Sequence, residues 1–330
     1  MKGRIRGFLL YCENIDFGKA KLSKTERNFS QRFSKEILSL CRSLPESAQT
    51  DAILFLMRYS RINVGDRLDF FANYYPPAWS IIYWLSRDSA LSCRLERGDV
   101  TNAVTAQSMA MFLHSLDDHL SDRQIPVSPL TLLLRTHVWT IMDHAFRTLA
   151  DGVPAGRRTI LRFVDDYYSG TQGSNGLRSL DSYCDLFRRQ MAVGMVAPTL
   201  LSLKMNRSSD FTRKLQIAYG SFGIAWRLLD DIRDISRDME KGAHSAIYLC
   251  LPQKVKAHWN NHKSKNRAAV KNSLITVLNH IQEYRLIEKI KERICAELET
   301  AASLVEAHDL TGLAREFRCL AHPLRKSSST

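Results

Sequence analysis

The sequence predicts an all-α protein, a single large antiparallel helical bundle. Apolar residues recur at helical spacing through long segments, as in Val104, Met109, Phe112 and Leu116. Alternating runs typical of strands are almost absent, and no Asn-Gly or Asp-Gly turn separates β-rich segments. A long chain with this pattern forms a helical bundle most naturally.

The helical segments follow one another with short polar or Pro-bearing loops. The uncharged run 70–86 is slightly short for a membrane span and is broken by Pro76 and Pro77, so we interpret it as a buried helix and expect no transmembrane segment. The other helices are expected near 25–44, 47–60, 103–120, 130–150, 157–169, 179–204, 211–229, 267–290 and 290–307.

Composition is ordinary for a globular protein, with 45% hydrophobic and 25% charged residues in 330. We expect one domain over residues 1–325 and a disordered tail at 326–330. The net charge of +13 suits an anionic partner, such as nucleic acid, a membrane surface or a phosphorylated substrate. The densest basic stretch, 254–271, lacks interleaved glycines and aromatics, so we interpret it as a solvated surface and predict no nucleic-acid binding.

The cysteines indicate a reducing compartment. Their number is odd and no CxxC spacing occurs, which favours neither a zinc site nor a disulfide framework. The apolar run that starts at Gly7 is stopped by Glu13 before it reaches the length of a signal peptide. A cytoplasmic location is therefore expected, and a homodimer is left open. The seven cysteines are Cys12, Cys41, Cys93, Cys184, Cys250, Cys295 and Cys319.

An acidic cluster ends the predicted helix 103–120. It contains Asp117, Asp118 and Asp122, and the last two are four residues apart, so they project from one helix face. Like charges at that spacing repel, and the negative end of the helix dipole adds to the cost. A bound cation would offset this repulsion.

A second acidic cluster follows the predicted helix 211–229, about a hundred residues later. Its members are Asp230, Asp231, Asp234 and Asp238, of which three repeat every four residues and share roughly one face. Carboxylate oxygens with open coordination positions suit Mg²⁺, which keeps waters and accepts phosphate oxygens. Two facing clusters can hold several ions, with Mn²⁺ as a substitute, around one diphosphate. The bland alternative is two solvated helix ends neutralised by Arg233 and Arg237.

The paired clusters resemble the two metal-binding motifs of the class I isoprenoid synthase superfamily, over roughly 60–310. That superfamily contains terpene synthases, trans-prenyltransferases and squalene/phytoene synthases. The resemblance implies the class I terpenoid synthase fold around a central cavity, Mg²⁺ and an isoprenyl diphosphate substrate. It also implies metal-binding roles for Asp117, Asp118, Asp122, Asp230, Asp231, Asp234 and Asp238.

Motif spacing is most similar to terpene synthases, whose second motif is (N/D)Dxx(S/T)xxxE followed by Gly, here matched by chemistry and ending at Gly242. Trans-prenyltransferases carry DDxxD twice, but their two basic elements are eroded here to Gly65-Asp66-Arg67 and a lone Arg123. Squalene/phytoene synthases use DxxxD twice, and Arg233 to Pro252 is faintly similar to their second segment. All three branches stay open at this point.

Aromatic residues favour the terpene cyclase branch. A cyclase needs one diphosphate site and a dry pocket with aromatic faces for carbocations. The segment 69–84 is rich in rings, although plain core packing explains such a stripe equally well. We expect pocket-lining roles for Phe70, Tyr74, Trp79 and Trp226.

Several basic and polar residues are candidates for the diphosphate. The resemblance implies a catalytic Arg, Arg188 or Arg189, that senses the diphosphate before a small residue at a kink, Gly194. Arg227, Arg233, Arg237 and Lys241 border the second cluster, and Tyr248 lies where related enzymes place a hydroxyl. We interpret His119 as a neighbour of the ligands, because imidazole rarely binds magnesium, and His244 as solvated.

The leading hypothesis is therefore a magnesium-dependent terpene cyclase, a lyase that ionises a C15 or C20 isoprenyl diphosphate, with Asp117, Asp118 and Asp230 catalytic. The first alternative is a prenyl-coupling transferase, either similar to squalene/phytoene synthases or a trans-polyprenyl diphosphate synthase. The second alternative is a non-catalytic helical partner subunit.

Overall fold

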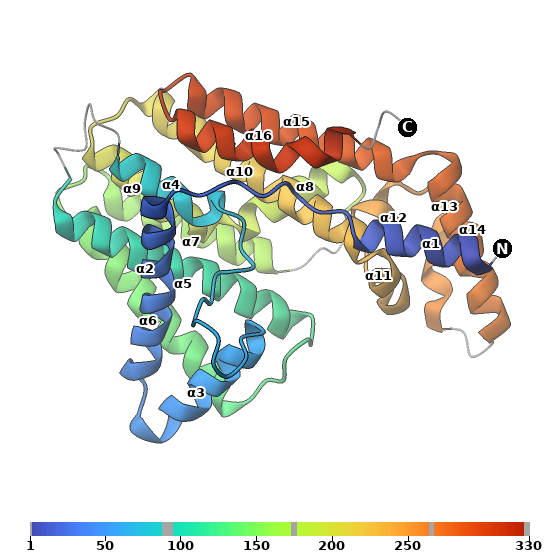
Figure 1. Ribbon diagram of the computed structural model, residues 1–330, viewed down its shortest axis with the longest axis horizontal. Coiled ribbons are helices and arrows are strands. Elements are labelled where there is room, and N and C mark those ends of the chain that lie inside the picture. The colour runs from blue at the N-terminus through green and yellow to red at the C-terminus, as the bar shows by residue number, and fades with distance from the viewer. Residues whose placement is uncertain (1, 88–94, 173–176, 264–266, 327–330) are drawn as a thin grey trace.

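The computed structural model describes residues 2–87, 95–172, 177–263 and 267–326. Within these residues the chain forms helices and no strand, which confirms the all-α prediction (Figure 1). The helices are α1 (Lys2–Glu13), α2 (Lys24–Ser43), α3 (Glu46–Tyr59), α4 (Pro77–Ser86), α5 (Arg97–Ser121), α6 (Pro129–Ala150), α7 (Gly156–Thr171), α8 (Leu180–Gln190), η2 (Ala192–Met195), α9 (Val196–Lys204), α10 (Ser209–Arg233), α11 (Ile235–Lys241), α12 (Ala246–Cys250), α13 (Gln253–Trp259), η3 (Asn260–Lys263), α14 (Arg267–Glu283), α15 (Leu286–Glu306) and α16 (Thr311–Lys326).

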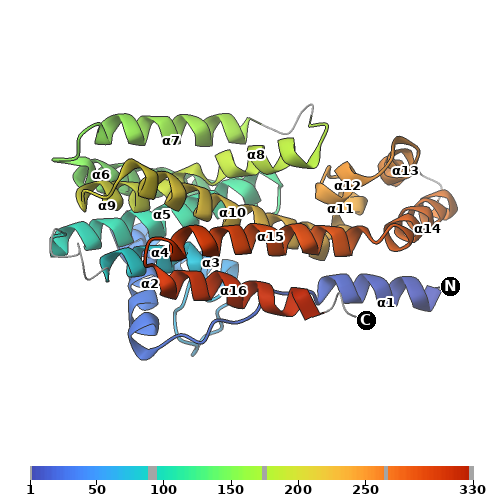
Figure 2. The ribbon, with the colours of Figure 1, turned by 90° about the horizontal axis from the view of Figure 1, so that it is seen from above.

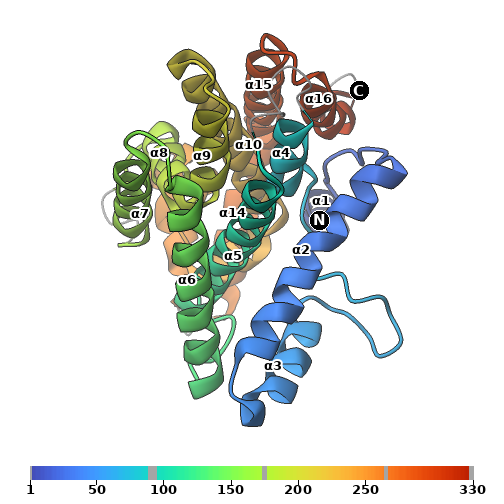
Figure 3. The ribbon, with the colours of Figure 1, turned by 90° about the vertical axis from the view of Figure 1, so that its left-hand side faces the viewer.

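Two long helices, α5 and α10, occupy the middle of the bundle. Helices α7 and α8 lie on one side of them, and α15 and α16 lie on the other, as the views from above and from the end show (Figures 2 and 3). The most extensive helix contacts join α10 to α15, α15 to α16 and α5 to α6. Helices α2 and α3 lie at one end of the molecule, and α13 and α14 lie at the other (Figure 1).

Capping residues fix where the two central helices start. Ser208 accepts a hydrogen bond from the backbone N–H of Phe211 at the start of α10. Glu96 and Asp99 cap the start of α5 reciprocally. Each helix then buries an apolar stripe over most of its length and ends in its aspartate cluster. Both clusters therefore lie at the ends of long helices, α5 and α10, that are packed along most of their length.

Most predicted helices are present, and the differences have local causes. The expected helix 70–86 begins only at Pro77, since residues 60–76 form turns and loop. The expected helix 179–204 is divided by the 3₁₀ segment η2, which contains Gly194. Helix α16, with Pro323 inside it, was not predicted, and it extends to Lys326, the first residue of the expected tail. Residues 327–330 lie outside the described part of the chain.

Two further sequence expectations can be compared with the described residues. Among them, no helix is both long enough and apolar enough to cross a bilayer. The six cysteines in the described segments are all free thiols: Cys12, Cys41, Cys184, Cys250, Cys295 and Cys319.

Candidate active site

Both aspartate clusters line one cavity of about 690 Å³, which we call the acidic cavity. It opens between the end of α5, the end of α10 and the segment that follows α10. All seven predicted aspartates line it: Asp117, Asp118, Asp122, Asp230, Asp231, Asp234 and Asp238. The helix ends thus face a common space, as the spacing of the motifs required.

The first cluster is anchored through one of its members. Asp117 forms a two-pronged ion pair with Arg135 of α6, with Nε–Oδ1 and Nη2–Oδ2 distances of 2.6 and 3.0 Å. The buried hydroxyl of Tyr167 on α7 also donates to Asp117, at 2.7 Å. Asp122 ends α5, is exposed, and accepts a hydrogen bond from Gln124 at 3.2 Å. Asp117 is therefore engaged in holding three helices together, while Asp118 and Asp122 face the cavity.

The second cluster is anchored through Asp231. Its side chain is 2% exposed, and Oδ2 accepts a hydrogen bond of 2.7 Å from the backbone N–H of Ala246, which starts α12. Arg227 lies one turn earlier on α10, with Nε 3.2 Å from Oδ1 of Asp231. Burial raises the pKa of Asp231, and Arg227 and the Ala246 N–H oppose that shift. Asp231 therefore ties the end of α10 to the chain that follows it.

The remaining members of the second cluster border the cavity. Burial raises the pKa of Asp230 to about 7 and that of Asp238 to about 7. Neighbouring carboxylates add to both shifts, and Arg227 opposes them. Asp234 pairs with Arg237 on the next turn. A divalent cation near these carboxylates would favour their charged forms and so offset the cost of burial.

Arg227 stands between the two clusters and lines the acidic cavity. Its Nε donates to the hydroxyl of Tyr183 at 2.6 Å, and its guanidinium lies over the rings of Tyr183 and Phe187 on α8. Although burial alone would lower its pKa, Tyr183, Asp231 and Asp118 hold the pKa of Arg227 well above its usual value. It is a fixed positive charge at the wall of the cavity.

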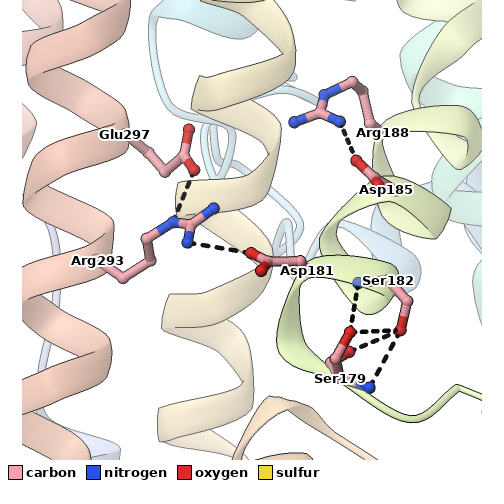
Figure 4. Close-up of polar contacts among 7 residues, drawn as sticks. All are labelled: Ser179, Asp181, Ser182, Asp185, Arg188, Arg293 and Glu297. Carbon is pink, nitrogen blue, oxygen red and sulfur yellow. Dashed lines mark hydrogen bonds and ion pairs between the residues drawn. The ribbon is translucent and has the colours of Figure 1, made fainter.

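The structure does not bring Arg188 and Arg189 to the acidic cavity. Both are exposed near the end of α8, and neither is among the cavity's lining residues. Figure 4 shows Arg188 reaching toward Asp185 on its own helix, while Arg293 of α15 holds the start of α8 through Asp181 at 3.3 Å. An arginine of α10, Arg227, lines the acidic cavity instead.

Of the other predicted polar residues, some line the acidic cavity and others do not. Arg237 and Lys241 line the acidic cavity. Arg233 points elsewhere, with Nη1 3.8 Å from Asp16. The ring of Tyr248 stacks on that of His244 at 4.0 Å between centroids, and it is His244 that lines the acidic cavity. A direct role for Tyr248 or Arg233 at the diphosphate therefore has no contact to support it.

A small inner cavity continues from the acidic cavity into the bundle. It measures about 180 Å³, below the roughly 300–1,000 Å³ of ordinary ligand pockets. Tyr74, Trp226 and Gly194 are among the residues that line it. A Cβ at Gly194 would lie 3.1 Å from the hydroxyl of Tyr219, so this glycine keeps the floor of the cavity open.

A larger neighbouring space, which we call the second cavity, measures about 780 Å³. Phe70, Tyr74, Trp79 and Trp226 line it, together with residues of the segment between α1 and α2. Asp230 and His119 line all three cavities, so the spaces meet beside the two clusters. The aromatic segment thus separates two spaces instead of enclosing one deep pocket.

The donor set suits Mg²⁺ only in combination with a ligand. In the described residues, no group of three or more His, Cys, Asp or Glu side chains is gathered closely enough to hold a metal alone. Magnesium is commonly held by one or two carboxylates, with phosphate oxygens and waters completing the octahedron. Asp118 and Asp122 on one wall, and Asp230, Asp234 and Asp238 on the other, fit that arrangement.

Sequence reasoning missed three residues that organise the site. Arg135, Tyr167 and Tyr183 come from α6, α7 and α8, and each binds an aspartate or arginine of the site. No local motif marks them. The available signal is physical: an acidic pair at a helix end cannot be buried without a cation or hydroxyl from a neighbouring helix.

The fold is similar to that of solved prenyl diphosphate synthases. A geranylgeranyl pyrophosphate synthase from Corynebacterium glutamicum matches with a TM-score of 0.65 and 13% identity, over 98% of this chain and 99% of that one. The same enzyme complexed with isoprenyl diphosphate and magnesium matches at 0.59 and 13%, over 91% and 99%. A polyprenyl synthetase from Streptomyces coelicolor matches at 0.64 and 11%, over 90% and 98%. No protein-family model and no curated protein sequence matches the chain.

These comparisons correct the leading hypothesis from the sequence. The similar structures are of prenyl diphosphate synthases, so terpene cyclisation was the wrong choice and the prenyl-coupling alternative is favoured. The cavities agree with the correction, since the inner cavity is small and a second, larger space adjoins the acidic one. The aromatic run misled because most of its rings pack on one another as core.

Proposed function

We propose that the chain is a magnesium-dependent prenyltransferase. It binds an allylic isoprenyl diphosphate in the acidic cavity and transfers the prenyl group to a second substrate in the second cavity. The observation that carries this proposal is that two carboxylate clusters line one cavity, and that Asp230 and His119 of its wall also line a second cavity. The similarity to a synthase complexed with isoprenyl diphosphate and magnesium supports it.

In this proposal, basic side chains on one wall hold the diphosphate. Arg227, Arg237 and Lys241 line the cavity beside the second cluster and supply donors for phosphate oxygens. Asp118, Asp122, Asp230, Asp234 and Asp238 would hold the magnesium ions, which neutralise the charge that builds on the departing diphosphate. Arg227 does not reorganise when that charge develops, because Tyr183 and Asp231 already fix its position.

The reacting carbon then lies toward the aromatic wall. Breaking the C1–O bond leaves the electron pair on the diphosphate and a delocalised positive charge on the allyl group. The rings of Tyr74 and Trp226, whose centroids are 5.6 Å apart, border both the inner and the second cavity and stabilise that charge. Buried walls keep water away, so the second substrate captures the carbon.

The test is turnover of allylic diphosphates. The protein is incubated with Mg²⁺, with geranyl, farnesyl or geranylgeranyl diphosphate, and with isopentenyl diphosphate or indole as the second substrate. The release of inorganic diphosphate is measured, and products are identified by mass spectrometry. We expect Mg²⁺-dependent release that EDTA abolishes. The matched control is Asp143→Asn, an exposed aspartate on α6 paired with Arg147, which should behave as wild type. No release from any of the three substrates would refute the proposal.

A further inference from the structure

The second cavity has a charge balance unlike that of the acidic cavity. Three basic side chains and three acidic ones line it. One basic group is already close to an acidic one, since Arg233 lies 3.8 Å from Asp16. Asp16 and Asp69 offset two of the three basic charges, so a second diphosphate, which carries about three negative charges at neutral pH, would find little net positive field here. The six residues are Lys19, Arg61, Arg233, Asp16, Asp69 and Asp230.

The basic residues that the sequence offered for a second diphosphate are located elsewhere. Arg67 and Arg123 are both exposed, and neither occurs among the described residues that line the acidic or the second cavity. Arg61 does line both cavities, but it is exposed at their rim. The structure therefore provides no arginine cluster for gripping a second phosphate group within the described residues.

Aromatic rings make up much of the wall of the second cavity. Phe17 contacts Tyr75 edge to face at 4.7 Å between centroids, and Tyr75 contacts Trp226 in the same manner at 5.3 Å. Trp226 in turn meets Tyr74 at 5.6 Å. A chain of perpendicular rings offers alternating faces and edges, which is the geometry in which another ring packs favourably.

The first ring of this wall is held in place by the segment between α1 and α2. The N–H of Gly18 donates to the carbonyl of Leu320 at 3.0 Å, and a Cβ at Gly18 would lie 2.0 Å from the carbonyl oxygen of Cys319. The neighbouring Asp16 accepts a hydrogen bond of 2.6 Å from the hydroxyl of Tyr75. Phe17, between them, is 4% exposed. Phe17 is therefore fixed by contacts of both of its neighbours in the chain.

We propose that the second substrate is an uncharged, electron-rich aromatic ring, bound against this wall, and not a second prenyl diphosphate. The inference rests on the proposed function, because it names the acceptor of that reaction. The C1–O bond of the allylic diphosphate breaks and the electron pair leaves with the diphosphate. A π pair of the ring forms the new bond to C1, and the ring proton passes to the departing diphosphate. The products are a prenylated aromatic and hydrogen diphosphate.

Competition between acceptors tests the inference. The full-length protein, Mg²⁺ and geranylgeranyl or farnesyl diphosphate are incubated with indole, with 1,6-dihydroxynaphthalene or with isopentenyl diphosphate, and products are identified by mass spectrometry. We expect an aromatic adduct and no elongated diphosphate. Elongation without an adduct overturns the inference, and so does diphosphate release with neither product. If no allylic diphosphate is consumed under any condition, the proposed function itself fails.

A variant of the wall distinguishes binding at this cavity from chance reactivity. Phe17→Leu keeps an apolar side chain but removes the ring, and we expect it to raise KM for the aromatic acceptor about fivefold. The matched control is Tyr168→Leu on α7, an exposed aromatic that lines none of the three cavities, and it should keep the wild-type KM. Equal KM values for the two variants would contradict binding against the wall.

Discussion

The two aspartate clusters end helices of equal length, 25 residues each, yet they divide their work in opposite order. In the first cluster the leading aspartate, Asp117, is engaged by Arg135 and Tyr167, and Asp118 faces the cavities. In the second cluster the leading aspartate, Asp230, faces the cavities, and Asp231 is engaged by Arg227 and Ala246. In each Asp-Asp pair, one aspartate therefore holds neighbouring residues, and we call it the anchor. The other aspartate faces the cavities, where it is free to bind a cation.

Burial also distinguishes the clusters. Asp231 is almost completely enclosed, whereas Asp122 is exposed and its helix ends at the surface. Charges in the second cluster therefore interact in a poorly solvated setting, where each missing partner is costly. The second cluster is therefore the more buried wall of the acidic cavity, and the first cluster is the more exposed one.

The largest expected effect separates ligands from anchors. Asp118→Asn and Asp230→Asn should each lower the rate of diphosphate release by about 10³-fold, because each removes a carboxylate that would bind a metal beside the departing charge. Asp117→Asn should cost about tenfold, since it disturbs only the orientation of its neighbour. Rates are measured at saturating Mg²⁺, with folding checked by circular dichroism. A loss in Asp117→Asn as large as that in Asp118→Asn would contradict the division.

The two anchoring aspartates, Asp231 and Asp117, should differ in how much they contribute to stability. Asp231→Ala removes a buried carboxylate and leaves both the half-buried Arg227 and the backbone N–H of Ala246 without their acceptor, and we expect a loss of about 3–5 kcal/mol in the free energy of unfolding. Asp117→Ala should cost about 1–2 kcal/mol, because Arg135, whose side chain is 42% exposed, can turn to water. Equilibrium unfolding in urea measures both. Equal losses would show that burial is not what distinguishes the anchors.

The pH dependence of stability follows from the raised pKa values of Asp230 and Asp238, both about 7 against an ordinary 3.8. Between these values the unfolded chain is ionised while the folded protein still holds the protons. Unfolding then releases protons, so metal-free stability should fall as pH rises from about 4 to 7 and level off above. We expect a decrease of about 4 kcal/mol, mostly from the buried Asp230, because screening reduces the contribution of the partly exposed Asp238.

The matched variant for this prediction is Asp230→Asn combined with Asp238→Asn. Because an amide does not titrate, the unfolding free energy of this double variant should vary less with pH than that of the wild type, over the same range and in the presence of EDTA. Denaturation curves at pH 5, 6, 7 and 8 provide the measurement. A wild-type protein whose stability rises with pH across this window would mean that these carboxylates are ionised in the fold.

The sequence predicted the fold and the two acidic walls because both rest on local signals. Helical periodicity marks α5 and α10, and the spacing of Asp118 to Asp122 marks a face. The partners of the site were not predictable in this way. Arg135, Tyr167 and Tyr183 act across helices whose packing no short pattern encodes.

The cyclase hypothesis failed for a related reason. Rings close in sequence, such as Phe71 and Tyr74, were expected to line a single pocket, but rings of one segment also pack on each other. The second cavity is formed when the distant Phe17 and Trp226 meet that segment, so its existence depends on tertiary structure. The number of cavities beside the two clusters could therefore not be predicted from the sequence, and neither could the choice between cyclase and transferase.

The smallest expected effect concerns the hydroxyl that supports the first cluster. Tyr167→Phe removes one hydrogen bond to Asp117 but leaves the two-pronged pair with Arg135 intact. We expect a loss of about 1 kcal/mol in unfolding free energy and about a threefold lower rate of diphosphate release. The control is Tyr168→Phe on the exposed face of the same helix, which should change neither quantity. If Tyr167→Phe were as damaging as Asp118→Asn, the hydroxyl would contact the reacting groups, and the first cluster would have no separate anchor.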